Sequence, residues 1–119
     1  MDTGELNDYT YYNGYEGYPE FILSSGDKSM HIWDGYLEDI FGEPPLDGQD
    51  WYGLTKDFHE DTGPFDSFEP CPIDVEAYLS DAISCRGRKM RFEESPAVLE
   101  AMISWLSAHK DAEVFAVLD

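Results

Sequence analysis

The amino-acid sequence predicts an α+β fold: a single domain with a mixed sheet of three to five strands, two or three helices and a C-terminal β-α-β unit. The chain has 119 residues, of which 42% are hydrophobic, and this is enough for one core but not for two. Short runs of strand-forming residues lie near the start, and amphipathic helical patterns lie near the end. We therefore expect residues 1–119 to fold as one domain.

The first strands are expected near the start of the chain. Residues 1–18 contain five tyrosines, and we expect a strand here after a few disordered residues; the alternative is a segment that becomes ordered only on a partner. Residues 21–23 and 30–33 are short runs of strand formers. The Gly26-Asp27 pair between them is typical of a hairpin turn.

The middle of the chain has one short helical pattern followed by a proline-rich stretch. Apolar residues between 34 and 42 have helical spacing, but Gly42 and Pro44 limit this helix to one or two turns. Residues 43–72 contain five of the seven prolines, three glycines and scattered aromatic side chains. This composition predicts a long irregular region, which in a small domain is usually functional or mobile.

The last third of the chain has the most regular pattern. A helix is expected to begin at or just before Asp74, and residues 89–93 alternate as a strand. Ser95 is expected to cap a second helix with Pro96 at its first position. A final apolar run at residues 114–118 predicts a central strand, so the order strand, helix, strand predicts a right-handed parallel crossover. The second helix is expected to bury Val98, Leu99, Met102, Ile103 and Leu106.

The charge of the chain excludes several classes of partner. The 26 Asp and Glu residues against 7 Lys and Arg give a net charge of −19, which disfavours direct binding to nucleic acid or to an anionic membrane. Residues 1–70 carry 17 acids and 2 bases, net −15, whereas residues 71–119 carry 9 acids and 5 bases, net −4. Such a charge destabilises the compact state by self-repulsion, so we expect it to be selected by something other than folding.

The sequence also bears on the compartment. Its first residues have neither a basic nor an apolar region typical of an export signal, and it has no run of 18 apolar residues. Its two cysteines, Cys71 and Cys85, are too few for a disulfide framework and are expected to be reduced. We therefore expect a cytoplasmic protein.

A catalytic or metal site is not expected. His59 lies among acids in the run from Lys56 to Asp61, and such a histidine could serve as a general base or as one metal ligand. However, the three histidines fall in different predicted elements, and there is no His-x-x-x-His or Cys-x-x-Cys pair and no calcium-binding loop. We expect His59 to be a solvated loop residue, and we expect no enzyme activity, cofactor or metal.

The acidic and aromatic stretch from Asp34 to Asp61 is the predicted partner-binding surface. Carboxylates steer a basic partner over long range, and Trp and Tyr are frequent interface hot spots. The alternative is that the acids form a solvated face and that the aromatic residues pack in the core. The predicted partner-binding residues are Asp34, Tyr36, Glu38, Asp39, Asp47, Asp50, Trp51, Tyr52, Asp57, His59, Glu60 and Asp61.

This acidic stretch, together with the small domain formed by residues 89–118, resembles in kind the immunity proteins that bacteria make against their own nuclease or deaminase toxins. The resemblance implies stoichiometric inhibition of a basic protein, a cognate toxin domain. Carboxylates would pair with the lysines and arginines that the toxin uses to hold phosphates. Trp51 or Tyr52 would fill or cover the toxin's cleft.

Two other functions compete with the inhibitor. A phage or plasmid DNA mimic, such as an antirestriction or anti-CRISPR protein, needs the same negative field but spaces its carboxylates along an elongated surface. An enzyme would need His59 to converge with acids in a pocket. The uneven charge favours one concentrated patch, and hence the inhibitor.

Overall fold

The computed structural model describes residues 7–12, 14–15, 17–26, 28–42, 53–60, 62–66, 69–87 and 89–119. Within these residues, a five-stranded sheet has the order β1-β3-β2-β5-β4. Its strands are β1 (Asn7–Tyr11), β2 (Glu20–Ser25), β3 (Lys28–Trp33), β4 (Cys71–Pro72) and β5 (Phe115–Leu118). The helices are α1 (Asp34–Phe41), α2 (Gly53–Glu60), α3 (Val75–Ser84) and α4 (Ser95–Ala108), with a 3₁₀ helix, η3 (Gly63–Asp66), after α2.

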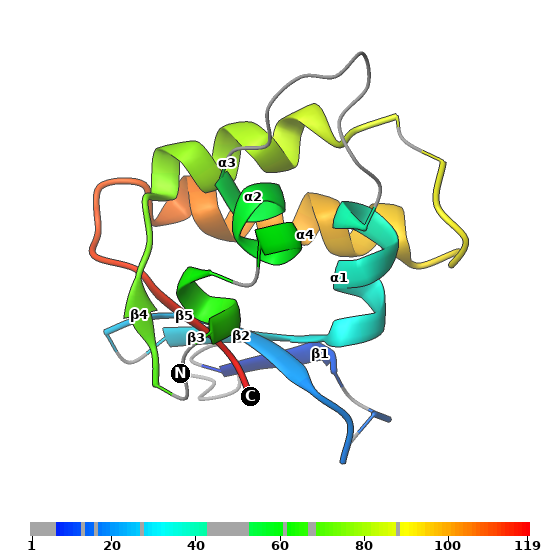
Figure 1. Ribbon diagram of the computed structural model, residues 1–119, viewed down its shortest axis with the longest axis horizontal. Helices are drawn as coiled ribbons and strands as arrows, with labels where there is room; N and C mark the ends of the chain where they lie inside the picture. Colours follow the sequence, from blue (N-terminus) through cyan, green and yellow to red (C-terminus); the bar gives the residue numbers. More distant parts are fainter. Residues whose placement is uncertain are drawn as a thin grey trace, which may run out of the picture.

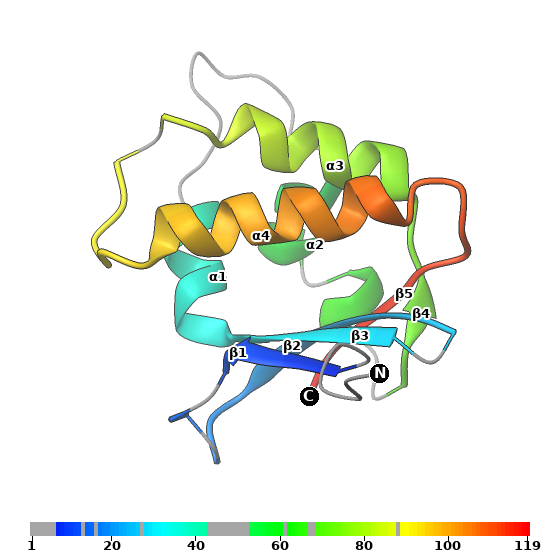
Figure 2. The same ribbon diagram turned by 180° about the vertical axis from the view of Figure 1, so that it is seen from behind.

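The helices lie on one face of a mixed sheet. Strand β1 runs parallel to β3, whereas the β2–β3, β2–β5 and β4–β5 pairs are antiparallel. Figures 1 and 2 show α4 between the sheet and α3, with α1 at one end of the helical layer. The predicted α+β class and the mixed sheet are confirmed.

Local sequence signals account for the first strands. Ser25 pairs with Lys28 across the β2–β3 turn, and Gly26 has φ +60°, a conformation that glycine adopts without steric cost. The hairpin at this position is confirmed. The expected N-terminal strand is also confirmed as β1, while residues 1–6 lie outside the described residues.

The C-terminal β-α-β prediction is wrong. Residues 89–94 form an irregular connection between α3 and α4, and β5 runs antiparallel to both of its neighbours. Met90 and Phe92 alternate because both pack against the core. The backbone N–H groups of Arg91 and Phe92 donate to the carboxylate of Asp39, each at 2.9 Å, and not to a neighbouring strand. The described residues also contain four α-helices, whereas two or three were expected.

The predicted irregular region contains a helix, α2, at residues 53–60. Its first turn is held by a residue far along the chain: Asp81 Oδ2 accepts hydrogen bonds from Thr55 N and Thr55 Oγ1, both at 2.7 Å. Gly53 begins the helix at φ +60°, and a Cβ there would stand 2.6 Å from the carbonyl oxygen of Ala77. Both the backbone conformation and the close approach to α3 therefore require glycine.

The two remaining helices follow their sequence signals with small differences. Helix α3 begins at Val75, one residue after the expected start, and Asp74 Oδ1 caps it by accepting from Ala77 N at 3.2 Å. In α4, by contrast, Ser95 is the first helical residue and Glu94 occupies the cap position. The Ser95 hydroxyl donates to Asp39 Oδ2 at 2.7 Å, so it serves the contact with α1 and does not cap its own helix.

The core lies between the sheet and the helices. Burial of each large apolar side chain contributes about 1.5–3 kcal/mol. All five residues predicted for the buried face of α4 are buried. They meet the helix-facing side chains of the sheet and the inner face of α1, which are Phe21, Leu23, Met30, Ile32, Ala116, Leu37, Ile40 and Phe41. Cys71 and Cys85 are free thiols.

Asp39 joins three parts of the fold. Its side chain is 3% exposed and accepts from Arg91 N, Phe92 N and Ser95 Oγ, and more distantly from Arg91 Nε at 3.4 Å. Burial alone raises the pKa of Asp39, but the hydrogen bonds from Phe92, Arg91 and Ser95 outweigh it and hold the pKa below its usual value. The ionised carboxylate therefore stabilises the folded state.

We predict that Asp39→Asn lowers the free energy of unfolding at neutral pH by about 1–3 kcal/mol, because an amide cannot accept from all of these donors. The lowered pKa means that the carboxylate stabilises the fold above the unfolded-state pKa of about 3.9, and that this contribution is lost as the pH falls toward the folded-state pKa. The difference between the two proteins should therefore shrink below about pH 4.

Urea unfolding monitored between pH 3 and pH 7 measures this difference. Glu38→Gln, at an exposed carboxylate on the same helix, is the control and should behave like the unmodified protein. A stability of Asp39→Asn equal to that of the unmodified protein at pH 7 would contradict the role of Asp39.

Candidate functional site

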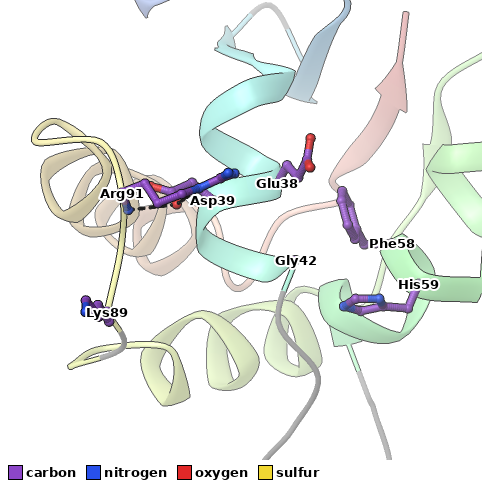
Figure 3. Close-up of a pocket in the computed structure, with 7 residues that line it drawn as sticks. All are labelled: Glu38, Asp39, Gly42, Phe58, His59, Lys89 and Arg91. Carbon is purple, nitrogen blue, oxygen red and sulfur yellow. Dashed lines mark hydrogen bonds and ion pairs between the residues drawn. The ribbon is translucent and has the colours of Figure 1, made fainter.

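A hollow of about 510 Å³ lies at the C-terminal end of α1. Its walls come from three segments that are far apart in the sequence (Figure 3): the last turns of α1, the end of α2, and the connection between α3 and α4. The volume is in the range of small-molecule and side-chain binding pockets. The lining residues are Glu38, Asp39, Gly42, Phe58, His59, Lys89 and Arg91.

The walls of this pocket are fixed by hydrogen bonds. His59 Nε2 lies 2.8 Å from the carbonyl oxygen of Phe41. Because a carbonyl can only accept, Nε2 carries the proton and ties the end of α2 to the end of α1. On the other side, Asp39 fixes the backbone of Arg91 and thereby the connection that carries Lys89. Hydrogen bonds thus hold two sides of the pocket.

The chemistry of the pocket is mixed. Lys89 and Arg91 are exposed cations on one side of the α1 terminus, and the Phe58 and His59 rings lie on the other (Figure 3). Glu38 adds an exposed carboxylate. In the described residues, no group of three or more His, Cys, Asp or Glu side chains could hold a metal ion. The pocket can therefore receive a polar side chain or small molecule through charge pairing and ring contact.

The basic wall of the pocket, formed by Lys89 and Arg91, was not among the residues predicted from the sequence. Residues 86–91 carry four of the seven Lys and Arg residues and no acid. Arg86 forms a bidentate pair with Glu100 at 2.7 and 2.8 Å, Lys89 and Arg91 line the pocket, and Arg88 lies outside the described residues. A count of charge in short windows, in place of the two long segments 1–70 and 71–119, would have revealed this cluster.

The segment that contains the pocket residues Phe58 and His59 is rich in acids. From Asp57 to Cys85 the chain carries eight acids and no Lys or Arg. Figure 1 shows β4 and the start of α3, which belong to this segment, at one end of the molecule, with α2 nearer its middle. We define the acidic face by its five exposed carboxylates, Glu60, Asp66, Glu69, Asp74 and Glu76.

Asp57 holds the elements under the acidic face together. Its carboxylate accepts from the hydroxyl of Tyr78 on α3 and from Thr62 Oγ1 at 2.9 Å, just before η3. Burial, and then the hydrogen bond to Asp57, raise the pKa of Tyr78, so its hydroxyl stays protonated and donates. A Cβ at Gly63, where φ is +56°, would lie 3.0 Å from Asp57 Oδ2. The turn after α2 is therefore tightly packed around this carboxylate.

The structure distributes the predicted partner-binding residues over several environments. Tyr36 and Asp39 are buried, and the carboxylate of Asp39 is engaged in internal hydrogen bonds. Glu38 and His59 both line the pocket, and Glu60 belongs to the acidic face. The half-buried members are Asp34, Asp57 and His59, the exposed members are Glu38 and Glu60, and the members outside the described residues are Asp47, Asp50, Trp51, Tyr52 and Asp61.

Comparison with known proteins assigns the chain to no family. The chain matches no protein-family model, no curated protein and no solved structure. Among the described residues, no helix has the length and apolar character needed to cross a membrane.

We predict that Asp81→Ala weakens α2 and the acidic face. The change leaves the buried N–H and hydroxyl of Thr55 without their acceptor, which costs about 1–3 kcal/mol. Thr55→Val is the matched control, because it removes only the hydroxyl bond and keeps Thr55 N paired; its cost should be about 1 kcal/mol. Amide hydrogen exchange should show residues 53–60 opening faster in Asp81→Ala than in Thr55→Val. Equal protection of α2 in both variants would contradict the capping role of Asp81.

Proposed function

We propose that this protein is an acidic inhibitor that binds and neutralises a basic partner, as the immunity protein of a nuclease or deaminase toxin. The observation that supports the proposal is the acidic face: five exposed carboxylates on a segment, residues 57–85, that contains no Lys or Arg. Enzymes that act on nucleic acids hold phosphates with Lys and Arg side chains. Carboxylates on the surface of a folded protein can pair with the same cations and so block the cleft in which the enzyme binds its nucleic acid.

Electrostatic attraction would drive this association. The net charge of −19 produces a long-range field that steers a cationic partner and raises the association rate. The segment from Asp57 to Cys85 contributes eight acids and no base to this charge, and the nearest base along the chain before it is Lys56 on α2. Added salt screens exposed charges, so the association should slow as ionic strength rises.

Internal hydrogen bonds hold α2 and α3, which carry part of the acidic face, and this favours tight binding. Asp81 holds the first turn of α2, and Asp57 ties the end of α2 to α3 and to Thr62. A preorganised surface avoids the free-energy cost of ordering loops and side-chain supports on binding. The inward carboxylates of Asp57 and Asp81 thus hold the elements that carry the exposed carboxylates.

The pocket can supply the hollow that an interface hot spot fills. Helix α2 carries residues of both features, because Phe58 and His59 line the pocket and Glu60 belongs to the acidic face. A partner seated on the acidic face can therefore insert one side chain into the pocket. Hot-spot residues commonly fill such hollows at the centre of an interface.

We predict that reversing three charges of the acidic face, with Glu60, Asp66 and Glu69 each changed to Lys, abolishes capture of a basic nucleic-acid enzyme. The measurement is affinity capture from host lysate at low salt, with proteins identified by mass spectrometry, followed by an activity assay of the captured enzyme. The unmodified protein should inhibit this enzyme at a one-to-one ratio. The triple variant should lose most of the association rate and its dependence on salt.

The control carries the same number of reversed charges elsewhere, at Glu93, Asp111 and Asp119, which are also exposed. It should retain inhibition. If both triple variants bind equally well, the acidic face is not the interface. If the captured enzyme is a restriction or CRISPR nuclease and not a toxin, the protein is a DNA mimic.

A further inference from the structure

A repeated tyrosine turn connects β1 and β2. The sequence Tyr-x-Gly occurs twice in succession from Tyr12 and is followed by Tyr18. Tyr15 N donates to Tyr12 O, and Tyr18 N donates to Tyr15 O, each at 3.0 Å. Gly14 and Gly17 have φ values of +95° and +96°, which suits the third position of a type II turn. We call Tyr12, Gly14, Tyr15, Gly17 and Tyr18 the tyrosine turn.

The tyrosine turn is fixed against the body of the protein. The Tyr15 ring stacks on Trp33 with centroids 4.1 Å apart and planes 6° apart. The Tyr12 hydroxyl donates to the carbonyl oxygen of Tyr18 at 2.6 Å. The side chain of Tyr18, by contrast, is 62% exposed. The turn therefore presents a solvated aromatic ring on a rigid support, as binding surfaces rich in Tyr and Gly do.

The backbone of Asp34 lies next to the end of the tyrosine turn. Asp34 N donates to the carbonyl oxygen of Pro19 at 3.1 Å, which places the start of α1 beside the residue that follows Tyr18. The Asp34 carboxylate is half-buried, and burial, followed by repulsion from Glu38, raises its pKa. Within the described part of the chain, no Lys, Arg or His forms an ion pair with it. A cation placed here would therefore gain an acceptor that solvent screens only in part.

The aromatic cluster that Tyr15 joins to the turn favours a guanidinium over other cations. Trp33 packs on Tyr36 and on Phe92, with centroids 5.2 and 5.5 Å apart. The same aromatic cluster already accepts one guanidinium, because Arg91 lies over the Phe92 ring at 6.0 Å from its centroid. A planar guanidinium can stack on a ring and pair with a carboxylate at the same time, whereas an ammonium cannot stack.

We propose that the tyrosine turn, Trp33 and Asp34 form the anchor site for one arginine side chain of the basic partner, with the guanidinium paired to Asp34 and laid against the exposed aromatic ring. This inference rests on the proposed function and adds to it. The acidic face steers the partner, and the anchor site selects arginine at one position. Figure 2 shows the β1–β2 connection protruding from the end of the sheet beside α1, where a partner can reach it.

The probe that tests the anchor site is N-acetyl-arginine amide, titrated into isotope-labelled protein and followed by NMR. We expect saturable shifts centred on Tyr18, Trp33 and Asp34, and a lower pKa of Asp34 in the presence of the probe. N-acetyl-lysine amide has the same charge without the planar group and should bind more weakly. Shifts spread evenly over all exposed carboxylates, or equal binding of the two probes, would overturn the anchor site.

Two variants with matched controls separate the anchor site from general attraction. Asp34→Asn should weaken arginine binding about tenfold or more, since a charge-assisted pair is lost. Tyr18→Ala should weaken it by about twofold to fivefold. Glu93→Gln and Ile83→Ala, at an exposed acid and at the other exposed large apolar residue of the described chain, should leave it unchanged.

These outcomes distinguish the two proposals. Unchanged arginine binding in both Asp34→Asn and Tyr18→Ala overturns the anchor site, even if the acidic-face variants still lose the partner. Loss of arginine binding in these variants supports the anchor site whether or not the captured partner is a toxin. The pKa of Asp34 can also be compared with and without the arginine probe in the unmodified protein. This comparison tests the anchor site even if a variant folds poorly.

Discussion

The carboxylate of Asp39 is the contact on which the rest of the helical layer depends. It projects from α1 and accepts from two backbone N–H groups of the α3–α4 connection and from the first residue of α4. A buried charge is costly unless donors surround it, and in this protein they do. This one carboxylate therefore sets where α4 begins against the sheet, where the basic residues of the connection lie, and how the pocket at the end of α1 is bounded.

Acids thus have two opposite roles in a chain of net charge −19. Asp39, Asp57 and Asp81 point inward and join separate segments of the fold by accepting hydrogen bonds from backbone or hydroxyl groups. The carboxylates of the acidic face point outward on the elements that these contacts fix. Self-repulsion among the outward acids opposes folding, and the inward acids offset part of it with hydrogen bonds that exist only in the folded state.

Most of the fold was predictable because most of its signals are local. The hairpin follows from Gly26 between two apolar runs, and α3 follows from its capping residue Asp74. Helix α2 was not predictable in this way, because the group that holds its first turn, Asp81, is 26 residues from Thr55. The expected strand at residues 89–93 failed for a related reason. Alternating burial of side chains does not show whether the backbone N–H groups of the segment donate to a neighbouring strand or to a carboxylate.

The candidate site was harder to predict than the fold. Tyr36, Asp39 and Ile40 have the i, i+3, i+4 spacing of one helix face, so the inward position of Asp39 was already present in the pattern. The pocket could not be predicted, since it joins Glu38, Phe58 and Lys89 from three segments. The anchor site at the tyrosine turn likewise depends on the pairing of β2 with β3, which brings Trp33 beside the residues that follow Tyr18.

The most direct test of this division between inward and outward acids is a carboxyl titration of every Asp and Glu residue by NMR. If inward carboxylates build the fold, Asp39 should titrate below the usual aspartate range, while Asp34, half-buried and beside Glu38, should titrate above it. If Asp39 instead titrates together with the exposed acids, its carboxylate does not hold the α3–α4 connection, and the helical layer does not depend on it.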